Sequence, residues 1–280
     1  MRIVEASNIT TLVERLCIEA CCVITDDIYN SFKTSIKSEK SPLGREILGT
    51  LIENADIARS ERNPICQDTG MTVVFVTMGQ NIQISGGFIE DAINQGVRQG
   101  YQKGYLRKSV VSDPIDRVNT QDNTPAVIHY EIVAGDEFHI TVAPKGFGSE
   151  NKSGLKMLTP SEGGEGIKRF VIDTVSQAGA NPCPPIIVGV GIGGTMERAA
   201  YMSKKALLRP VGTTNPDPTL QQLERELLDA INNLGIGPAG FGGSTTALSV
   251  NIITGATHIA GLPVSVNIGC HATRHAEGRL

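Results

Sequence analysis

The sequence contains no tryptophan, and aromatic residues make up only 4% of it. Proteins that bind single-stranded nucleic acid rely on such side chains to stack on bases. The lysines and arginines form no run, and the formal net charge is −4, which disfavours phosphate backbones and anionic membrane surfaces as partners. We therefore expect neither nucleic acid nor a membrane among the partners of this protein.

Long apolar runs are absent as well. No stretch approaches the roughly 20 apolar residues that a membrane-spanning helix needs, and the segment Met1 to Glu5 has an early acid in place of the apolar core of a signal peptide. These absences predict a cytoplasmic protein in which the six cysteines are reduced. The remaining composition, 40% hydrophobic and 19% charged over 280 residues, is that of a globular protein with a substantial core.

The cysteines include no Cys-x-x-Cys pair. Cys17, Cys21 and Cys22 lie in a segment, residues 9–24, whose apolar residues recur at helical spacing. A cysteine packs well as a small apolar residue on such a helical face. We interpret these three as core residues rather than metal ligands.

The other three cysteines, Cys66, Cys183 and Cys270, lie in loops rich in glycine and proline, 117 and 87 residues apart. Three thiolates from separate loops suit an iron–sulfur cluster in which one iron has no protein ligand, and such an iron can act as a Lewis acid in catalysis. A disulfide is not expected in the cytosol, and zinc normally takes four ligands with at least one short spacing. Unrelated buried thiols remain the alternative.

Helical and strand patterns alternate along the chain without a regular strand–helix–strand repeat. Gly135 and Asp136 predict a hairpin between two of the strands, residues 126–133 and 137–143. We expect an α/β (α+β) fold of small mixed sheets surrounded by helices, in one catalytic domain that spans residues 1–280. Helices are predicted at residues 9–24, 42–57, 88–101, 166–178, 195–208 and 220–234, and further strands at 71–78, 186–188, 246–253 and 264–268.

Residues 189–194 satisfy the Gly-x-Gly-x-x-Gly pattern of dinucleotide-binding loops. That fingerprint also needs a second strand that ends in an acid about 20 residues later. Here residues 209–216 contain two prolines and cannot form a central strand. We therefore do not assign nucleotide binding, and we expect the glycines to let the backbone pass close to a bulky neighbour.

Two further segments carry candidate polar groups. The segment Lys145 to Lys152 directly follows a predicted strand, which is where a fold presents residues to a pocket, although an ordinary surface turn would look the same. His258 follows the predicted strand 246–253 and is either a proton carrier or a core residue.

Several unusual strings occur in one order along the chain and cover nearly all of it. Together they closely resemble class I fumarase and the tartrate dehydratase branch of the same iron–sulfur hydro-lyase family. The resemblance implies the α-domain fold of that family and a [4Fe–4S] cluster held by Cys66, Cys183 and Cys270, with the fourth iron open to substrate. The strings are Cys66-Gln67-Asp68-Thr69-Gly70, Leu106-Arg107, residues 145–152, Asn181-Pro182-Cys183-Pro184-Pro185 and Asn267-Ile268-Gly269-Cys270-His271-Ala272.

The resemblance also implies roles for individual residues. Gln67 and Asp68 would lie beside the cluster and contact the substrate end that the iron holds. Arg107 would fork onto one substrate carboxylate, and Gly148 would offer its backbone to the other. His258 would pair with Asp68 in proton movement, which makes these two the implied catalytic residues. The loop departs from its relatives before Gly148, where this chain has phenylalanine and they often have glycine.

The chain ends ten residues after Cys270, which resembles the α subunit of two-subunit family members. This implies a separate β subunit that carries the base for the carbon-bound proton, and an α2β2 assembly. The implied reaction is the interconversion of fumarate and (S)-malate, as in the tricarboxylic acid cycle, with L(+)-tartrate dehydration as the alternative. From another class, the alternative is a non-catalytic iron–sulfur sensor or scaffold, but a scaffold would not need Asp68, Arg107 and His258 around one site.

Overall fold

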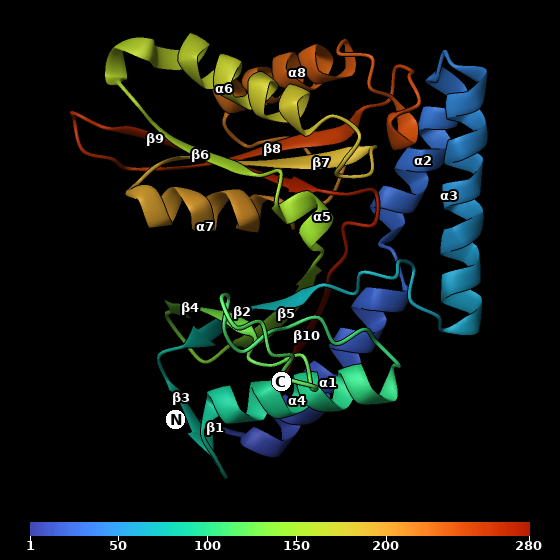
Figure 1. The fold of residues 1–280 in the computed structure, drawn as a ribbon. Coiled ribbons are helices and arrows are strands. Elements are labelled where there is room, and N and C mark those ends of the chain that lie inside the picture. The colour runs from blue at the N-terminus through green and yellow to red at the C-terminus, as the bar shows by residue number, and fades with distance from the viewer. The chain divides into compact units, whose positions relative to one another are not determined.

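The computed structural model describes residues 1–280, which form two compact units. Each unit combines segments that are far apart in the sequence (Figure 1). Helices and small mixed sheets alternate along the chain, which confirms the predicted α/β fold class. Neither unit is one continuous segment. The single catalytic domain across the whole chain stays a prediction. Unit 1 comprises Met1–Thr25, Asn54–Phe147 and Arg274–Leu280, and unit 2 comprises Asp26–Glu53 and Gly148–Thr273.

Unit 1 is built on a four-stranded sheet with the strand order β10-β5-β2-β4. In the central strand β2, residues 72–76 are all buried, and residues 73–76 form the continuous apolar run that is typical of a strand covered on both faces. β5 pairs with β2 and β10 in antiparallel orientation, while β4 is parallel to β2. The strands are β2 Met71–Gly79, β4 Val127–Val133, β5 Phe138–Lys145 and β10 Ala276–Arg279, and a separate parallel pair consists of β1 Arg2–Glu5 and β3 Ile82–Ser85.

The predicted hairpin between residues 126–133 and 137–143 is wrong. Both strands exist, as β4 and β5, but β2 lies between them and pairs with each. The residues directly after β2 lie beside the connection between β4 and β5, since the Asn81 N–H donates to the Gly135 carbonyl at 3.0 Å. β2 takes the central place because it is buried along most of its length, whereas β4 is largely exposed and suits an edge.

Two helices, α1 (Ala6–Cys22) and α4 (Ile89–Lys103), cover one face of this sheet (Figure 1). Their apolar residues recur at helical spacing and join alternate strand residues such as Val74 and Ile140 in one core. Cys17 and Cys21 belong to this core, which confirms their interpretation as core residues. Burial raises the pKa of the Cys21 thiol to about 12, so this thiol is neutral at physiological pH.

Unit 2 has a sheet with the strand order β6-β9-β7-β8, in which β7 is buried throughout. Figure 1 shows α6 and α8 on one face of this sheet and α7 on the other. The apolar faces of α6 and α8 join the core of the sheet, and α7 packs against β7 on the other face, so each face of the sheet is covered. The elements are α5 Phe147–Glu150, β6 Gly154–Leu158, α6 Gly163–Ala178, β7 Ile186–Gly193, α7 Met196–Ala206, α8 Pro218–Asn232, β8 Ala247–Gly255 and β9 Leu262–Gly269, with 3-10 turns at Pro160–Glu162 and Pro238–Gly240.

The glycines of the 189–194 pattern serve the packing of α7 on β7. A Cβ atom at Gly189 would overlap the carbonyl oxygen of Ser203, and one at Gly191 would overlap that of Ala199. Only glycine therefore lets the helix backbone come this close to the strand. The predicted close approach is confirmed, and the bulky neighbour is the helix itself.

The helix α2 (Asp26–Ser38), which precedes α3 (Pro42–Glu61), is missing from the sequence-based prediction. Glu39 in their connection is 1% exposed, and its carboxylate accepts hydrogen bonds from the backbone N–H groups of Ser41, Ser244 and Thr245 at 2.8–2.9 Å. Burial acts to raise the pKa of Glu39, but these hydrogen bonds outweigh it and lower the pKa to about 2. The carboxylate thus ties the connection to the loop before β8.

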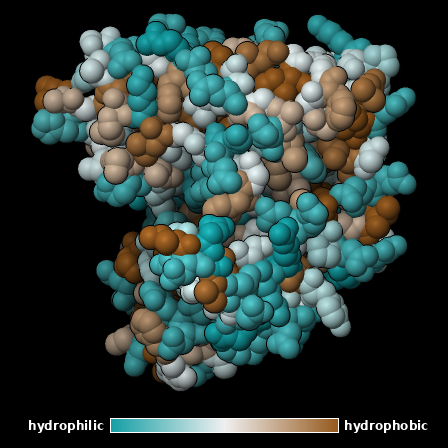
Figure 2. Space-filling model, viewed as in Figure 1, coloured by the Kyte–Doolittle hydropathy of each residue, from teal (hydrophilic) through white to brown (hydrophobic).

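No helix is both long and apolar enough to cross a membrane. Figure 2 shows the hydrophobic residues of the visible face in small groups between hydrophilic ones.

Four short strands are missing from the sequence-based prediction: β1, β3, β6 and β10. They have only four or five residues each and give too short a pattern to recognise.

Candidate active site

The first cysteine loop connects α3 to β2 in unit 1. Its residues alternate between anchors and presented side chains: Ile65 and Thr69 are buried, whereas Gln67 is exposed and Cys66 is half-buried. The backbone N–H of Ile65 donates to the Cys21 carbonyl of α1 at 2.9 Å, which fixes the start of the loop. The loop therefore presents Cys66, Gln67 and Asp68 from a firmly held backbone.

Both carboxylate oxygens of Asp68 accept hydrogen bonds from backbone N–H groups. Oδ1 accepts from Gly70 at 3.0 Å and Oδ2 from Phe147 at 2.9 Å. The Asp68 carbonyl also accepts a hydrogen bond from the Arg274 guanidinium. Asp68 is therefore oriented before any substrate arrives, and its carboxylate joins the loop to the segment that follows β5.

Arg107 lies in the segment that follows α4, also in unit 1. Its carbonyl oxygen accepts a hydrogen bond from the Thr69 hydroxyl at 3.0 Å, which places this segment directly beside the Cys66 loop. The Arg107 side chain is exposed. The structure thus places the segments that carry Cys66, Gln67, Asp68 and Arg107 side by side in unit 1, and the roles of these residues stay a prediction.

The two remaining cysteines lie at one edge of the sheet in unit 2. Cys183 precedes β7 and Cys270 directly follows β9, and these strands are antiparallel with Ile187 opposite Gly269. His271 joins the two loops, because its backbone N–H donates to the Cys183 carbonyl at 3.1 Å. Cys183 is exposed and Cys270 is half-buried, so both can present sulfur outward.

Gly148 begins the segment that leads to this same edge. Glu150 accepts a hydrogen bond from the Asn267 amide at 3.2 Å, and Ser153 accepts one from the Ile268 N–H at 3.0 Å. The predicted polar loop thus contains the short helix α5 and runs along the end of β9. Gly148 therefore begins a segment that lies beside the end of β9, directly before Cys270.

His258 lies at the opposite edge of the sheet in unit 2. It follows β8, whose last residue Gly255 pairs with Gly193 at the end of β7. Since the cysteines lie at the start of β7, about six residues of extended strand, roughly 20 Å, separate them from this edge. His258 is exposed, and its Nδ1 accepts a hydrogen bond from the Ala260 N–H at 3.2 Å. The structure does not bring His258 near Cys183 or Cys270 of its own chain.

The cysteines of α1 and those of the loops differ in solvent accessibility. None of the six cysteines forms a disulfide. The three in α1 are buried, while Cys66, Cys183 and Cys270 are all at least partly accessible. Neither unit by itself contains three His, Cys, Asp or Glu side chains close enough to hold a metal ion. The accessible thiols in polar loops are the donor type that iron–sulfur clusters use.

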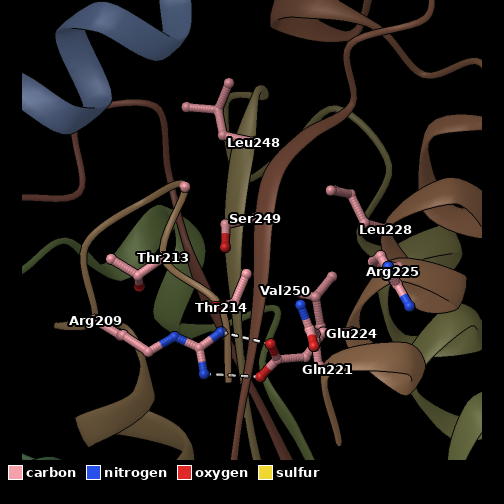
Figure 3. Close-up of a pocket in the computed structure, with 11 residues that line it drawn as sticks. Arg209, Thr213, Thr214, Gln221, Glu224, Arg225, Leu228, Leu248, Ser249 and Val250 are labelled. Atoms are coloured by element: carbon pink, nitrogen blue, oxygen red, sulfur yellow. Dashed lines mark hydrogen bonds and ion pairs between the residues drawn. The ribbon is translucent and has the colours of Figure 1, made fainter. Parts of the chain in front are cut away.

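Two cavities in unit 2 contain none of the predicted site residues. The larger, about 730 Å³, is lined mainly by hydroxyl and amide side chains of α2 and of the loop before β8. The smaller, about 150 Å³, lies beside β8 and α8 (Figure 3). There both carboxylate oxygens of Glu224 accept hydrogen bonds from the Arg209 guanidinium, at 2.8 and 2.7 Å. The positive charge of Arg209 is thus already neutralised, so it is not offered to an anion.

Comparison with known proteins decides the family. The model of the fumarate hydratase (Fumerase) family matches residues 10–279. The chain belongs to this family. It is 43% identical to the putative L(+)-tartrate dehydratase subunit alpha of Methanocaldococcus jannaschii, over 98% of both chains. It is 37% identical to the L(+)-tartrate dehydratase subunit alpha of Escherichia coli (strain K12), over 91% of this chain and 84% of the relative.

Family membership confirms the resemblance that the cysteine loops and the other strings indicate, and it places this fumarate hydratase family member among hydro-lyases. The relatives above carry the name tartrate dehydratase. The sequence alone favours fumarate over tartrate, so the substrate in these relatives' names differs from the favoured one.

The sequence-based prediction assigns no role to three residues that support this fumarate hydratase family site: Thr69, Tyr101 and Asn123. All three are at most 1% exposed and form hydrogen bonds to the backbone of the Cys66 loop or the Arg107 segment. Nothing in their spacing indicates this role, because the contacts join residues 14 to 53 positions apart.

Proposed function

We propose that this chain is the α subunit of an iron–sulfur hydro-lyase that dehydrates L(+)-tartrate. The observation that carries the proposal is the similarity, over 98% of its length, to a relative named as the α subunit of that enzyme. Fumarate hydratase is the second candidate, because the family model carries that name. Both substrates are small dicarboxylates, so the same carboxylate-binding groups could bind the substrate of either enzyme.

Cys66, Cys183 and Cys270 would hold a [4Fe–4S] cluster, which when bound supplies a Lewis acid for a substrate oxygen. The donor set fits, because all three thiols are accessible and none forms a disulfide. The hydrogen bond from His271 to the Cys183 carbonyl holds two of the ligand loops together.

The remaining roles fall on the polar groups of unit 1. Dehydration removes a hydroxyl group from one carbon and a proton from its neighbour, so the site needs a carboxylate anchor and a group that exchanges protons. The Arg107 guanidinium forms a planar fork that suits a substrate carboxylate. Asp68, with both oxygens oriented by backbone N–H groups, would exchange a proton with the substrate hydroxyl. Gln67 is exposed beside it and would hydrogen-bond the substrate, and the Gly148 backbone would contact the second carboxylate.

The position of His258 supports a role in a neighbouring molecule. His258 lies at the edge of its sheet that is opposite to Cys183 and Cys270, on an exposed connection between two long strands. We infer that two α subunits associate so that His258 of one reaches the site of the other, where it pairs with Asp68. A β subunit would cover the site and bring the base for the carbon-bound proton, which gives an α2β2 enzyme.

Co-expression with the product of an adjacent β-subunit gene, under anaerobic conditions, tests the proposal. We expect tartrate dehydration by the purified pair, about four irons per α chain, and negligible turnover by the α chain alone. Turnover of malate but not tartrate would favour the second candidate. If the iron-loaded α/β pair is inactive with all dicarboxylates, the result would support the alternative of a non-catalytic iron–sulfur scaffold.

A further inference from the structure

We propose that Thr69 and Asn123 are positioning residues that set the place of Arg107 relative to Cys66 and Asp68. The inference rests on the proposed function, because it deepens the carboxylate-binding role of Arg107. Neither residue contacts solvent to any useful extent, since Thr69 is 1% and Asn123 0% exposed, so both would act through the backbone that they bind.

Asn123 joins the two site segments with one side-chain amide. Its Nδ2 donates to the Gly70 carbonyl at 3.2 Å, and its Oδ1 accepts from the Ser109 N–H at 2.7 Å. The Gly70 carbonyl can only accept a hydrogen bond and the Ser109 N–H can only donate one, so the positions of Nδ2 and Oδ1 in the Asn123 amide are fixed. Asn123 has a φ of +62°, a conformation that asparagine and glycine tolerate better than other residues. Few residues could make this bridge from this backbone.

Thr69 supplies the second link from within the Cys66 loop. Its hydroxyl donates to the carbonyl oxygen of Arg107 at 3.0 Å. Together with the Ser109 bond, this fixes the backbone at the Arg107 carbonyl and again two residues later, with only Lys108 between the two points. The long Arg107 side chain leaves this fixed point and is exposed, so its reach toward a carboxylate depends on where the backbone is held.

Tyr101 on α4 provides a natural comparison. Its buried hydroxyl lies 2.7 Å from the Thr69 carbonyl and 3.1 Å from the Gly70 carbonyl. This hydroxyl therefore holds the Cys66 loop, whereas Tyr101 meets the Arg107 segment through its backbone carbonyl, which accepts from the Leu106 N–H at 3.0 Å and stays in place when the hydroxyl is removed. The loop has anchors of its own, and Thr69 and Asn123 add the specific coupling to Arg107.

A forked arginine–carboxylate contact is directional, and displacement of a positioning group by about 1 Å can cost two orders of magnitude in rate. A side chain as flexible as arginine gains directionality only if its backbone is fixed. The hydrogen bonds of Thr69 and Asn123 supply this, because buried polar groups keep their partners.

The test uses Thr69→Val, Asn123→Gly and, as the control, Tyr101→Phe in the assembled α/β enzyme. Valine keeps the shape of threonine, and glycine keeps the left-handed backbone. We expect Thr69→Val and Asn123→Gly to raise KM for tartrate about five- to 30-fold, the range for a lost buried hydrogen bond, with unchanged iron content. Tyr101→Phe should change KM little and instead speed iron loss.

A cycle with Arg107→Ala separates positioning from a general loss of stability. If Thr69 acts through Arg107, then Thr69→Val should add no further rise in KM once Arg107 is alanine. The same fold-change in both backgrounds, or an equal KM rise in Tyr101→Phe, would overturn the proposal.

Amide hydrogen exchange gives a readout that needs no activity. In Thr69→Val and Asn123→Gly, exchange of residues 106–110 should rise, whereas in Tyr101→Phe it should rise only in residues 66–70. Unchanged exchange in residues 106–110 would overturn the coupling. A wild-type enzyme inactive with every dicarboxylate would contradict the proposed function, and the exchange result would still decide whether these residues hold the Arg107 segment.

Discussion

The backbone N–H of His271 donates a hydrogen bond to the carbonyl oxygen of Cys183 at 3.1 Å, across 88 residues of sequence. It holds the loop after β9 against the loop before β7, and each loop carries a cysteine. The loops of two of the three predicted cluster ligands are therefore neighbours because of strand pairing, without a local sequence motif.

Replacement of a loop cysteine should abolish iron binding. Cys66→Ser, Cys183→Ser and Cys270→Ser remove a thiolate from a site that has no spare protein ligand. We expect iron content, measured after anaerobic reconstitution, to fall from about four per chain to near zero. Cys21→Ser is the matched control, because the buried, neutral Cys21 thiol is not a ligand. Full iron content in any of the three loop variants would remove that residue from the ligand set.

Asp68→Asn should separate chemistry from binding. The variant keeps the size of the side chain but loses its charge and its ability to exchange a proton, so we expect kcat to fall by about 10²-fold or more. Arg107→Ala should instead raise KM and leave the visible absorbance of the cluster unchanged. Steady-state kinetics of both variants in the α/β enzyme provide the measurement, and wild-type values in both would show that the site lies elsewhere.

His258 should act in the neighbouring α subunit. His258→Asn and Cys183→Ser would each be inactive alone. In a mixed dimer, one site would then combine an intact cluster with an intact His258. Random mixing should restore about a quarter of wild-type activity, because half of the dimers are mixed and each has one working site. Refolded or co-expressed mixtures, assayed beside each variant alone, test this. No recovery in the mixture would place His258 outside the neighbouring site.

Glu39 should make unit 2 sensitive to acid. Its pKa in the folded protein is lowered to about 2, below the ordinary value near 4.3 of an unfolded chain. The carboxylate thus contributes stability above about pH 4, and this contribution is lost as the pH falls toward 2. Glu39→Gln should destabilise the protein by about 1–3 kcal/mol at pH 7, as expected when buried donors lose an acceptor.

Denaturant unfolding at pH 7 and at pH 3 measures this difference. The gap between Glu39→Gln and the wild type should shrink at pH 3. The exposed Glu46 in α3 offers a control, since Glu46→Gln should change stability little at either pH. An equal gap at both pH values would contradict the linkage.

The sequence by itself determined the fold class, the family and the core role of the cysteines in α1. These follow from patterns that are local, such as the helical spacing around Cys17 and Cys21, or from strings such as residues 66–70 that keep their order along the chain. The β-branched and aromatic residues of the segment 71–78 likewise predicted the strand β2.

Only the tertiary structure decided which segments meet. It placed β2 between β4 and β5, because strand pairing depends on burial and competition among strands rather than on the turn that joins them. It brought Thr69 to Arg107 and Asn123 to Gly70 through buried hydrogen bonds that no spacing records. It also put His258 and Cys270 at opposite edges of one sheet, although only 12 residues separate them in the sequence, because β9 lies extended between the two.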